Sequence, residues 1–334
     1  MNASIEAFFL YMKISKENLE EKQISIYIIT ILISAFIGLN WNNSHILEKT
    51  IEPIIGILLY SMFCQIPFLE LKKALQNRSF FKALLFGNFV LIPLLVWALI
   101  TIFPNTPIVT LGILLVLLTP CIDYVIVFTH LGKGNSKAVL ASTPLLFIFQ
   151  MLLLPLYLWI FLGKETIAII EVAPFIKAFL YLIVIPFLLS IVTQTLSKSN
   201  NKAGRAVLDF SGWLPVPFMA FTFFVVIASQ IAVLYNNPAS ILKVIPVYIT
   251  FAVIAPFVGK FSAKIFKVDV FGSRAISFST STRNSLVVLP LALALPAPEN
   301  QLVAVVIVTQ TIVEIFFELI YIKAIPKITK DKVL

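Results

Sequence analysis

One arginine stands in a stretch of sequence that is otherwise apolar or neutral. Residues 277–296 read SFSTSTRNSLVVLPLALALP, and Arg283 is the single charged residue among them. The Ser, Thr and Asn side chains around it can cap a new helix, which predicts a break halfway along a helical segment. A permanent cation inside a membrane is costly and by default marks a functional site.

A second break is predicted in the segment PIVTLGILLVLLTPCIDYVIVFTHLGKG. Thr119, Pro120 and Asp123 interrupt it halfway, and proline removes a backbone donor. Because backbone groups freed at membrane depth need partners from protein or from a water-filled cavity, we expect the two breaks to face each other. The half-helices that follow, expected to begin near Ile122 and Asn284, would point their positive ends at one polar centre.

Arg283 is expected to have an acidic partner at this centre. Asp123 lies at the other break and is the first candidate, in an ion pair that fastens the crossing point. Glu314 and Glu318 compete for this role, since residues four apart share one face of a helix. The pairing separates two substrate classes, because a neutralised arginine suits an uncharged substrate and an unpaired arginine suits an anion.

The composition is that of an all-α integral membrane protein. The chain has 334 residues, of which 60% are hydrophobic and 12% charged, and its mean hydropathy is +1.00. A helix needs about 20 apolar residues to cross the hydrocarbon core, and the pattern predicts ten transmembrane helices. They are expected at 24–41, 50–68, 79–103, 107–132, 138–163, 172–197, 206–235, 240–266, 270–296 and 300–326.

The basic residues predict the orientation. Lys and Arg collect in the cytoplasmic loops of membrane proteins, and most of the 25 basic residues fall on one side of the ten spans. We therefore expect a multi-pass protein of the plasma (inner) membrane with both termini in the cytoplasm. The net charge of +9 then reflects topology and contact with anionic membrane lipid, and nucleic acid is not an expected partner.

The two halves of the chain resemble each other. The third to fifth predicted spans recur as the eighth to tenth at a nearly constant offset, and a unit with an odd number of spans is inverted in its second copy. The expected domains are a cytoplasmic segment (1–23), a first five-helix repeat (24–163), a second, inverted five-helix repeat (172–326) and a cytoplasmic tail (327–334).

Motifs for cofactors and catalysis are absent from the sequence. The two cysteines, Cys64 and Cys121, both fall inside predicted spans, so no disulfide framework is expected. Zinc-ligand spacings, a P-loop and the GxSxG and HExxH motifs do not occur. We expect no cofactor and no enzymatic activity.

The stretch TPCIDYVIVFTHLGKGN resembles the fourth-span signature of the arsenite efflux permeases, a family within the bile acid/sodium symporter superfamily. NFVLIPLLVWALI, which contains Asn88, and TQTIVEI, which contains Glu314, are also similar to the family. The signature positions are Pro120, Cys121, His130, Leu131, Lys133 and Gly134.

This resemblance implies a panel domain and a core domain, with the fourth and ninth helices unwound and crossed inside the core. The arsenite permeases place a required cysteine directly after the proline of the fourth-span break, and Cys121 matches it. A thiol suits this task, because trivalent arsenic is soft and bonds to sulfur.

Two positions depart from the superfamily. Its sodium-coupled members carry a glutamate and a glutamine that help hold the ion at the positions of Ser279 and Arg283. A fixed guanidinium repels sodium from that spot, so we expect Arg283 to stand in for the bound cation. Proton coupling is then expected, with Asp123 or Glu314 as carrier, because buried carboxylates can titrate near neutral pH. Arsenite permeases keep neither this arginine nor an aspartate at position 123.

The first functional hypothesis is therefore a proton-coupled efflux permease (antiporter) for arsenite, a small-molecule substrate that confers arsenic resistance when exported. Cys121 would bind the substrate, with polar help from Asn88, Asn284 and Ser285. The alternative is a symporter-like carrier of small organic anions that are gripped by Arg283, without sodium at positions 279 and 283.

Overall fold

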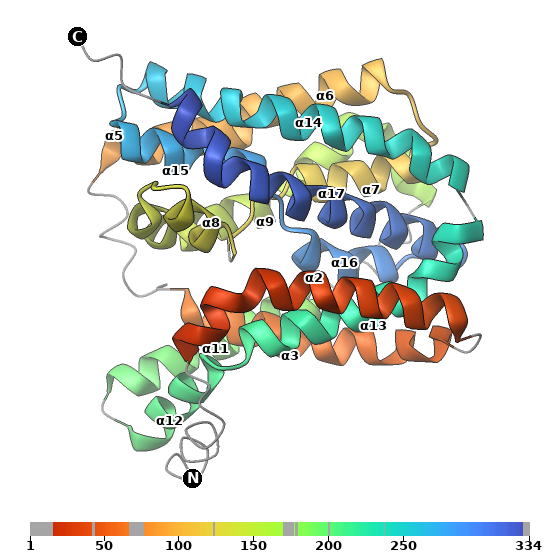
Figure 1. Ribbon diagram of the computed structural model, residues 1–334, viewed down its shortest axis with the longest axis horizontal. Helices are drawn as coiled ribbons and strands as arrows, with labels where there is room; N and C mark the ends of the chain where they lie inside the picture. Colours follow the sequence, from red (N-terminus) through yellow and green to blue (C-terminus); the bar gives the residue numbers. More distant parts are fainter. Residues whose placement is uncertain are drawn as a thin grey trace. The chain divides into compact units, whose positions relative to one another are not determined.

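The computed structural model describes residues 16–41, 44–66, 77–122, 124–169, 177, 180–199, 201–236 and 238–329. Its elements are helices joined by short segments, and each of the ten predicted ranges contains helix (Figure 1). The predicted lead-in of residues 1–23 is helical from Lys16 onward, and the residues before it lie outside the described part. The last helix continues to Ile328, so the start of the predicted tail is helical.

In the described part of the chain, fewer helices than predicted have the length and apolar composition of a membrane span. Among the described residues, 4 helices are long and apolar enough to cross a membrane, or up to 5 if a pair bent by 49° counts as one span. They are Arg78–Ile102, Ser136–Gly163, Leu242–Ile265 and Glu299–Ile328, with the bent pair Lys202–Ser211 and Pro215–Ser229. The chain is a multi-pass membrane protein, and ten spans stay a prediction.

Particular residues explain this difference. The segment predicted at 107–132 is interrupted after Leu117, and the one predicted at 270–296 is interrupted after Ser281, so each is present as two short helices. The helix predicted at 50–68 begins at Glu48, and its first turns carry the charges of Glu48, Lys49 and Glu52.

The chain divides into two compact units, and each draws on both halves of the sequence. The predicted five-helix repeats do not coincide with them and stay a prediction. The first unit combines residues 1–65 with 176–236. Its described helices are α2 (Lys16–Asn40), η1 (Ser44–Leu47), α3 (Glu48–Gln65), η4 (Leu180–Val184), α11 (Ile185–Lys198), α12 (Lys202–Ser211) and α13 (Pro215–Asn236).

In the first unit α2 lies along α13, as Figure 1 shows. Gly38 permits this approach, because a Cβ atom at that position would lie 2.4 Å from the carbonyl oxygen of Ala228. Side-chain hydrogen bonds between helices add to apolar packing in this unit. Gln194 Nε2, for example, donates to the carbonyl of Phe63 at 3.0 Å.

The second unit combines residues 66–175 with 237–334 and contains both breaks. Its described helices are α5 (Arg78–Phe86), η3 (Gly87–Leu91), α6 (Ile92–Ile102), α7 (Pro107–Leu117), α8 (Val125–Leu131), α9 (Ser136–Ile169), α14 (Pro238–Ile265), α15 (Val270–Ser281), α16 (Ser285–Leu293) and α17 (Glu299–Ile328). Helix α14 packs along α15, and α17 packs against α7, α14 and α16.

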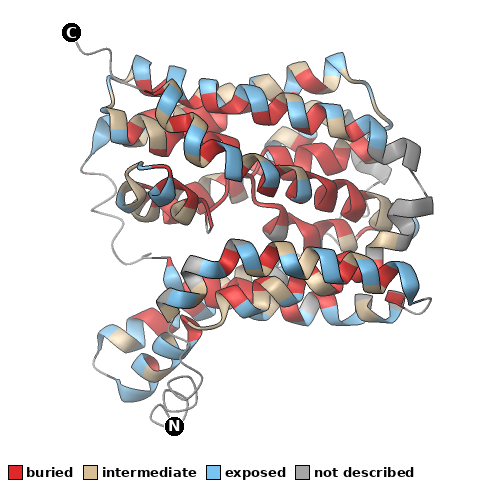
Figure 2. Ribbon diagram, in the orientation of Figure 1, coloured by how far each residue is buried: buried red, intermediate tan, exposed pale blue. Residues whose placement is uncertain are grey.

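The core of this unit lies where the short helices meet. Figure 2 shows α7 and α16 almost wholly in the colour of buried residues, whereas α14 alternates between buried and exposed positions. Seven consecutive residues of α7, 111–117, are buried. The two interrupted segments therefore lie inside the unit, and the long helices cover them.

Candidate functional site

The two interruptions have different local causes. After α7, Pro120 offers no backbone N–H, and the next helix begins only at Val125. After α15, the backbone of Thr282 is extended (φ −96°, ψ 128°), and Asn284 caps α16 by accepting a hydrogen bond on Oδ1 from the N–H of Val287 at 3.3 Å. The second half-helix begins where expected, and the first begins three residues later than expected.

The two breaks meet and satisfy each other's backbone groups. Pro120 and Arg283 form an isolated antiparallel β-bridge. The N–H of Cys121 donates to the carbonyl of Thr282 at 3.0 Å, and the N–H of Asn284 donates to the carbonyl of Thr119 at 2.8 Å. These residues are buried, so the exchange supplies partners that a broken helix cannot find in hydrocarbon.

The guanidinium of Arg283 lies in this crossing and has no solvent exposure (0%). Its Nη2 donates to Asn88 Oδ1 at 2.9 Å and to the carbonyl of Ser279 at 2.6 Å, and its Nη1 donates to the carbonyl of Leu117 at 3.3 Å. The ring of Phe251 lies 5.6 Å from the guanidinium carbon. These three acceptors, which are the hydrogen-bond partners of the guanidinium among the described residues, are neutral oxygens, so they orient its charge without pairing it directly with a carboxylate.

Asn88 reaches the guanidinium from a π-helical turn. The five residues Gly87–Leu91 form this turn in the middle of the third predicted span, and such turns often occur at functional sites. The side-chain Nδ2 of Asn88 donates to Ser279 Oγ at 3.0 Å and to the carbonyl of Leu84 at 3.1 Å. The amide is thereby fixed with its oxygen toward Arg283.

Replacing Asn88 with leucine, which has a similar volume, should destabilise the protein by about 2–3 kcal/mol, because it removes an acceptor from a buried charge. The measurement is thermal unfolding of the purified protein in detergent. Gln150→Leu is the matched control: Gln150 is also buried, at 1% exposure, but in the described part of the chain neither polar atom of its amide has a hydrogen-bond partner. An equal loss of stability in the two variants would contradict the assigned role of Asn88.

Glu314 joins the crossing through the backbone of Arg283. Its Oε2 accepts from the Arg283 N–H at 2.7 Å and from Gln310 Nε2, and its Oε1 accepts from the hydroxyl of Tyr124. Glu318, one turn further along α17, accepts from Thr282 Oγ1 at 2.5 Å. Both acidic residues that were predicted to compete for Arg283 thus contact its break, while Asp123 lies outside the described residues.

The remaining predicted residues are placed as follows. Cys121 is buried in the first break, and Ser279 accepts from Asn88. Ser285 lies at the start of α16, where its Oγ accepts from Thr311 Oγ1 at 2.7 Å. The structure therefore brings Asn88, Cys121, Ser279, Arg283, Asn284, Ser285 and Glu314 into one unit around the crossing.

Sequence reasoning missed Gln310, Tyr124 and Phe251. A signal for Gln310 is present, because Gln310, Glu314 and Glu318 recur every four residues in the central part of a mostly apolar helix. This spacing predicts one polar stripe facing the crossing. Tyr124 and Phe251 carry no comparable signal, since aromatic residues are frequent throughout the chain.

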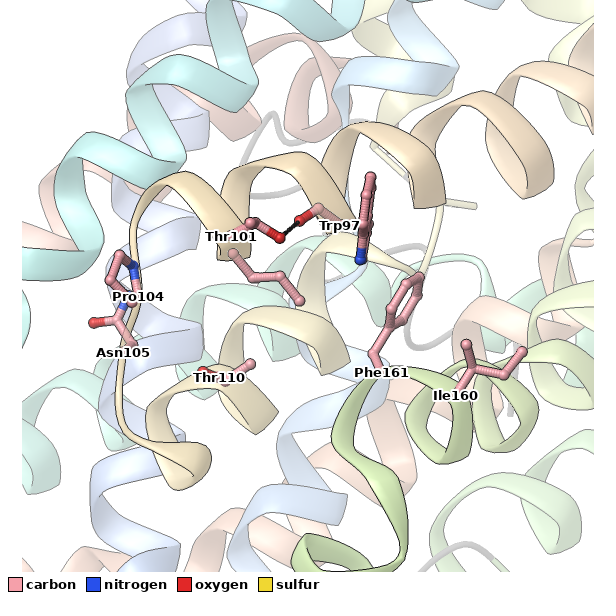
Figure 3. A pocket seen from close by; sticks show the side chains of 8 residues that line it. Trp97, Thr101, Pro104, Asn105, Thr110, Ile160 and Phe161 are labelled. Carbon is pink, nitrogen blue, oxygen red and sulfur yellow. Dashed lines mark hydrogen bonds between the residues drawn. The ribbon is translucent and has the colours of Figure 1, made fainter.

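A pocket lies apart from the crossing in the second unit. Its volume is about 330 Å³. Figure 3 shows its lining side chains, which come from α6, the segment after it, α7 and α9. Its lining includes Trp97, Thr101 and Phe161, and the Thr101 hydroxyl donates to the carbonyl of Trp97 at 2.8 Å. The volume suits a small molecule, but the lining carries no charged group. We therefore assign the site to the crossing.

A bundle of apolar helices that encloses two crossed, interrupted helices and a buried charge is typical of membrane transporters. The model of the sodium bile acid symporter family matches residues 52–237, which is more than half of the chain, and the chain belongs to this family. The match includes the first break but not the second. The members of this family are transporters, which agrees with the expectation that the protein is not an enzyme. A comparison with curated proteins gave no match.

Proposed function

We propose that the protein is a secondary carrier of small organic anions in which Arg283 supplies the positive charge of the binding site. The observation that carries this proposal is a fully buried guanidinium whose three hydrogen-bond acceptors among the described residues are neutral. A charge oriented in this way retains its attraction for a carboxylate, and the planar guanidinium can bind a carboxylate through two parallel hydrogen bonds. The family match supports a small-molecule substrate of this class.

The same geometry supports the idea that the guanidinium replaces a bound cation. The resemblance implies that sodium-coupled relatives hold an ion at the positions of Ser279 and Arg283. Here the Nη2 of Arg283 donates to the carbonyl oxygen of Ser279 and to Asn88 Oδ1. Two oxygens that could bind a sodium ion are therefore already bonded to the guanidinium. We propose that sodium does not bind between these residues.

The deciding experiment is transport in proteoliposomes of the purified protein. Small mono- and dicarboxylates, arsenite and antimonite serve as substrates, and sodium and proton gradients are imposed separately. Saturable uptake of at least one carboxylate supports the proposal. Transport of arsenite without any carboxylate would overturn it. The proton coupling predicted for Asp123 or Glu314 is tested by the same gradients.

Arsenite remains a second candidate substrate because of one observation. Cys121 lies in the crossing itself, with its N–H bonded to the carbonyl of Thr282. The thiol therefore belongs to the segment that the proposed carrier uses, and sulfur is the ligand that trivalent arsenic prefers.

Replacing Cys121 with serine separates the two candidates. If organic anions are the substrates, Cys121→Ser should retain their transport within about twofold, since the exchange alters one buried side chain by a single atom and keeps the charge of Arg283. Cys64→Ser, which changes the second buried cysteine, is the matched control for folding and membrane abundance. Loss of transport in Cys121→Ser alone, at normal abundance, would instead favour arsenite.

We also propose ten membrane spans in two inverted repeats, with a panel and a core domain. Pro120 and Arg283 pair at the crossing, and the offset between them equals the offset between the starts of the predicted fourth and ninth spans. Equivalent positions of two repeats would thus meet, and their antiparallel pairing suits copies of opposite orientation. Location in the plasma membrane and cytoplasmic termini belong to this proposal.

A further inference from the structure

Two acidic side chains of α17 are buried at the crossing, and their surroundings differ. Glu314 is 3% exposed and Glu318 has no exposure (0%). The carboxylate of Glu314 accepts three hydrogen bonds, from the backbone N–H of Arg283, from Gln310 Nε2 and from the hydroxyl of Tyr124. Two of these donors are N–H groups, which can only donate. These surroundings stabilise the ionised form of Glu314.

Glu318 has far fewer partners. Among the described residues, its Oε1 lies 2.5 Å from the hydroxyl of Thr282, and its Oε2 is buried without a hydrogen-bond partner. A carboxylate has about four acceptor positions, so an ionised Glu318 would leave most of them unfilled inside the protein. Burial of such a charge is costly, and the neutral acid avoids this cost.

The charges around the crossing also favour a proton on Glu318. Residues four apart share one face of a helix, and of two carboxylates that share a buried site one usually keeps its proton. An ionised Glu314 balances Arg283, whereas a second ionised carboxylate would give these three residues a net negative charge. The other titratable groups that the described residues place close by are a thiol and three phenols, those of Cys121, Tyr124, Tyr248 and Tyr321.

No described basic side chain other than Arg283 is buried with Glu318. Helices α7 and α16 pack against α17 and contain no titratable residue. The basic side chains of the other described helices that pack on α17 are exposed or partly exposed. They are His130 on α8, Lys243, Lys260 and Lys264 on α14, and Arg274 on α15.

Thr282 can serve both protonation states of Glu318. Its Oγ1 lies 2.5 Å from Glu318 Oε1 and 2.8 Å from the carbonyl oxygen of Phe278, and a hydroxyl has one proton to donate. When Thr282 donates to Phe278, its oxygen accepts a hydrogen bond from the protonated acid. When it donates to Glu318, it stabilises the carboxylate. The same contact therefore persists when Glu318 gains or loses a proton.

Thr282 also connects Glu318 to the crossing. Its backbone carbonyl accepts from the N–H of Cys121 at 3.0 Å, and the next residue is Arg283. A carboxylate formed at Glu318 would add negative charge beside this break and would weaken the attraction of the guanidinium for an anion. Protonation of Glu318 has the opposite effect and favours anion binding.

We propose that Glu318, rather than Glu314, is a proton-binding site of the carrier, and that it holds its proton while the crossing is closed. When water enters the crossing, the O–H bond of the carboxyl group breaks, the proton passes to water and the Thr282 hydroxyl turns from Phe278 to the carboxylate. Buried carboxylates carry protons in many transporters. Since coupling between two binding sites is reciprocal, a bound anion strengthens proton binding, and the two move in the same direction. This use of the proton rests on the proposed function, whereas the proton on Glu318 does not.

Infrared spectroscopy of the purified protein in detergent, at neutral pH and without substrate, tests the proton itself. A protonated carboxylic acid has a carbonyl stretching band that an ionised carboxylate lacks. We expect this band in the parent and its loss in Glu318→Gln. Glu299→Gln is the matched control and should keep the band, because Glu299 lies in the same helix but is partly exposed.

Absence of the band in the parent, or its persistence in Glu318→Gln, would overturn the proposal. If Glu318→Gln cannot be purified, Glu318→Asp takes its place. The shorter side chain withdraws the acid from Thr282, so the frequency of the band should change, and an unchanged frequency would also count against Glu318. Since no substrate is present, these outcomes are independent of whether carboxylates are transported.

Uptake into proteoliposomes tests the use of the proton. An external medium more acidic than the interior should accelerate carboxylate uptake by the parent at least about fivefold relative to equal pH, and Glu318→Gln should reduce this ratio to below about twofold. Glu299→Gln should keep the ratio of the parent. A ratio in Glu318→Gln equal to that of the parent would show that another group carries the proton.

Discussion

Replacing Arg283 with glutamine should reduce carboxylate transport by about 100-fold or more, because the substrate loses the fixed positive charge that Arg283 places at the crossing. The variant should also lose about 1–3 kcal/mol of stability, since glutamine cannot donate to all of the buried oxygens that the guanidinium contacts. Arg283→Lys keeps the charge but cannot reach the oxygens of Leu117, Ser279 and Asn88 in the same fork geometry. We expect it to fall between the parent and Arg283→Gln.

The measurements are initial uptake rates over a range of substrate concentrations, normalised to the amount of protein in the liposomes. Arg274→Gln is the matched control, because Arg274 is also in α15 and is partly exposed. Its Nη1 donates to the carbonyl of Lys133, away from the crossing. Parent-like uptake by Arg283→Gln would refute the role of the guanidinium, and so would an equal loss in Arg274→Gln.

Introducing a single methyl group at Gly259 should destabilise the second unit by more than about 4 kcal/mol. A Cβ atom there would lie 2.4 Å from Thr280 Oγ1, 2.6 Å from the Cα atom of Ser277 and 2.9 Å from the carbonyl oxygen of Ile276. Two of these contacts are with the backbone of α15, so relief requires α14 and α15 to separate. The measurement is the fraction of detergent-solubilised protein that stays monodisperse after heating. Gly259→Ala should lose this fraction at a much lower temperature than the parent protein.

Gly87→Ala provides the control for this prediction. A Cβ atom at Gly87 would also approach Thr280, but its nearest contact is the side-chain Cγ2 at 3.0 Å, which can shift. Alanine improves the intrinsic helix propensity equally at both positions, so the difference between the variants reports the packing of α14 on α15. Similar melting temperatures for the two variants would show that this close approach is not required.

The sequence was sufficient to predict where the helices break but not how the breaks are joined. The breaks have local causes: Pro120 lacks a backbone N–H donor, and the Ser, Thr and Asn side chains around Arg283 can cap a helix. Such local effects can be predicted from the sequence. The π-helical turn at Gly87–Leu91 and the hydrogen-bonded pairing of Thr119 with Asn284 depend on residues far apart in the chain. Neither could be predicted from periodicity.

The sequence was also insufficient to predict which acidic residue contacts Arg283. Asp123 was chosen because it lies at the equivalent break, and Glu314 and Glu318 were alternatives because they share a helix face. Charge alone favours any of the three. Among the described residues, which do not include Asp123, the structure places the carboxylate of Glu314 on the backbone N–H of Arg283 and gives the guanidinium neutral acceptors. This distinction depends on three-dimensional contacts. Asn88 was predicted as a polar residue of the site, but its contact with Arg283 also arises only in three dimensions.

The pairing between the two breaks also constrains how the protein is made. When the first break enters the membrane, the residues that will satisfy the N–H of Cys121 and the carbonyl of Thr119 have not yet been synthesised, because both partners belong to the second break. During this interval the ribosome-attached intermediate needs water, the insertion machinery or a chaperone around the unwound segment. Final assembly of the second unit must therefore follow translation of residues 282–284, and premature truncation would leave a segment suited to quality-control proteolysis.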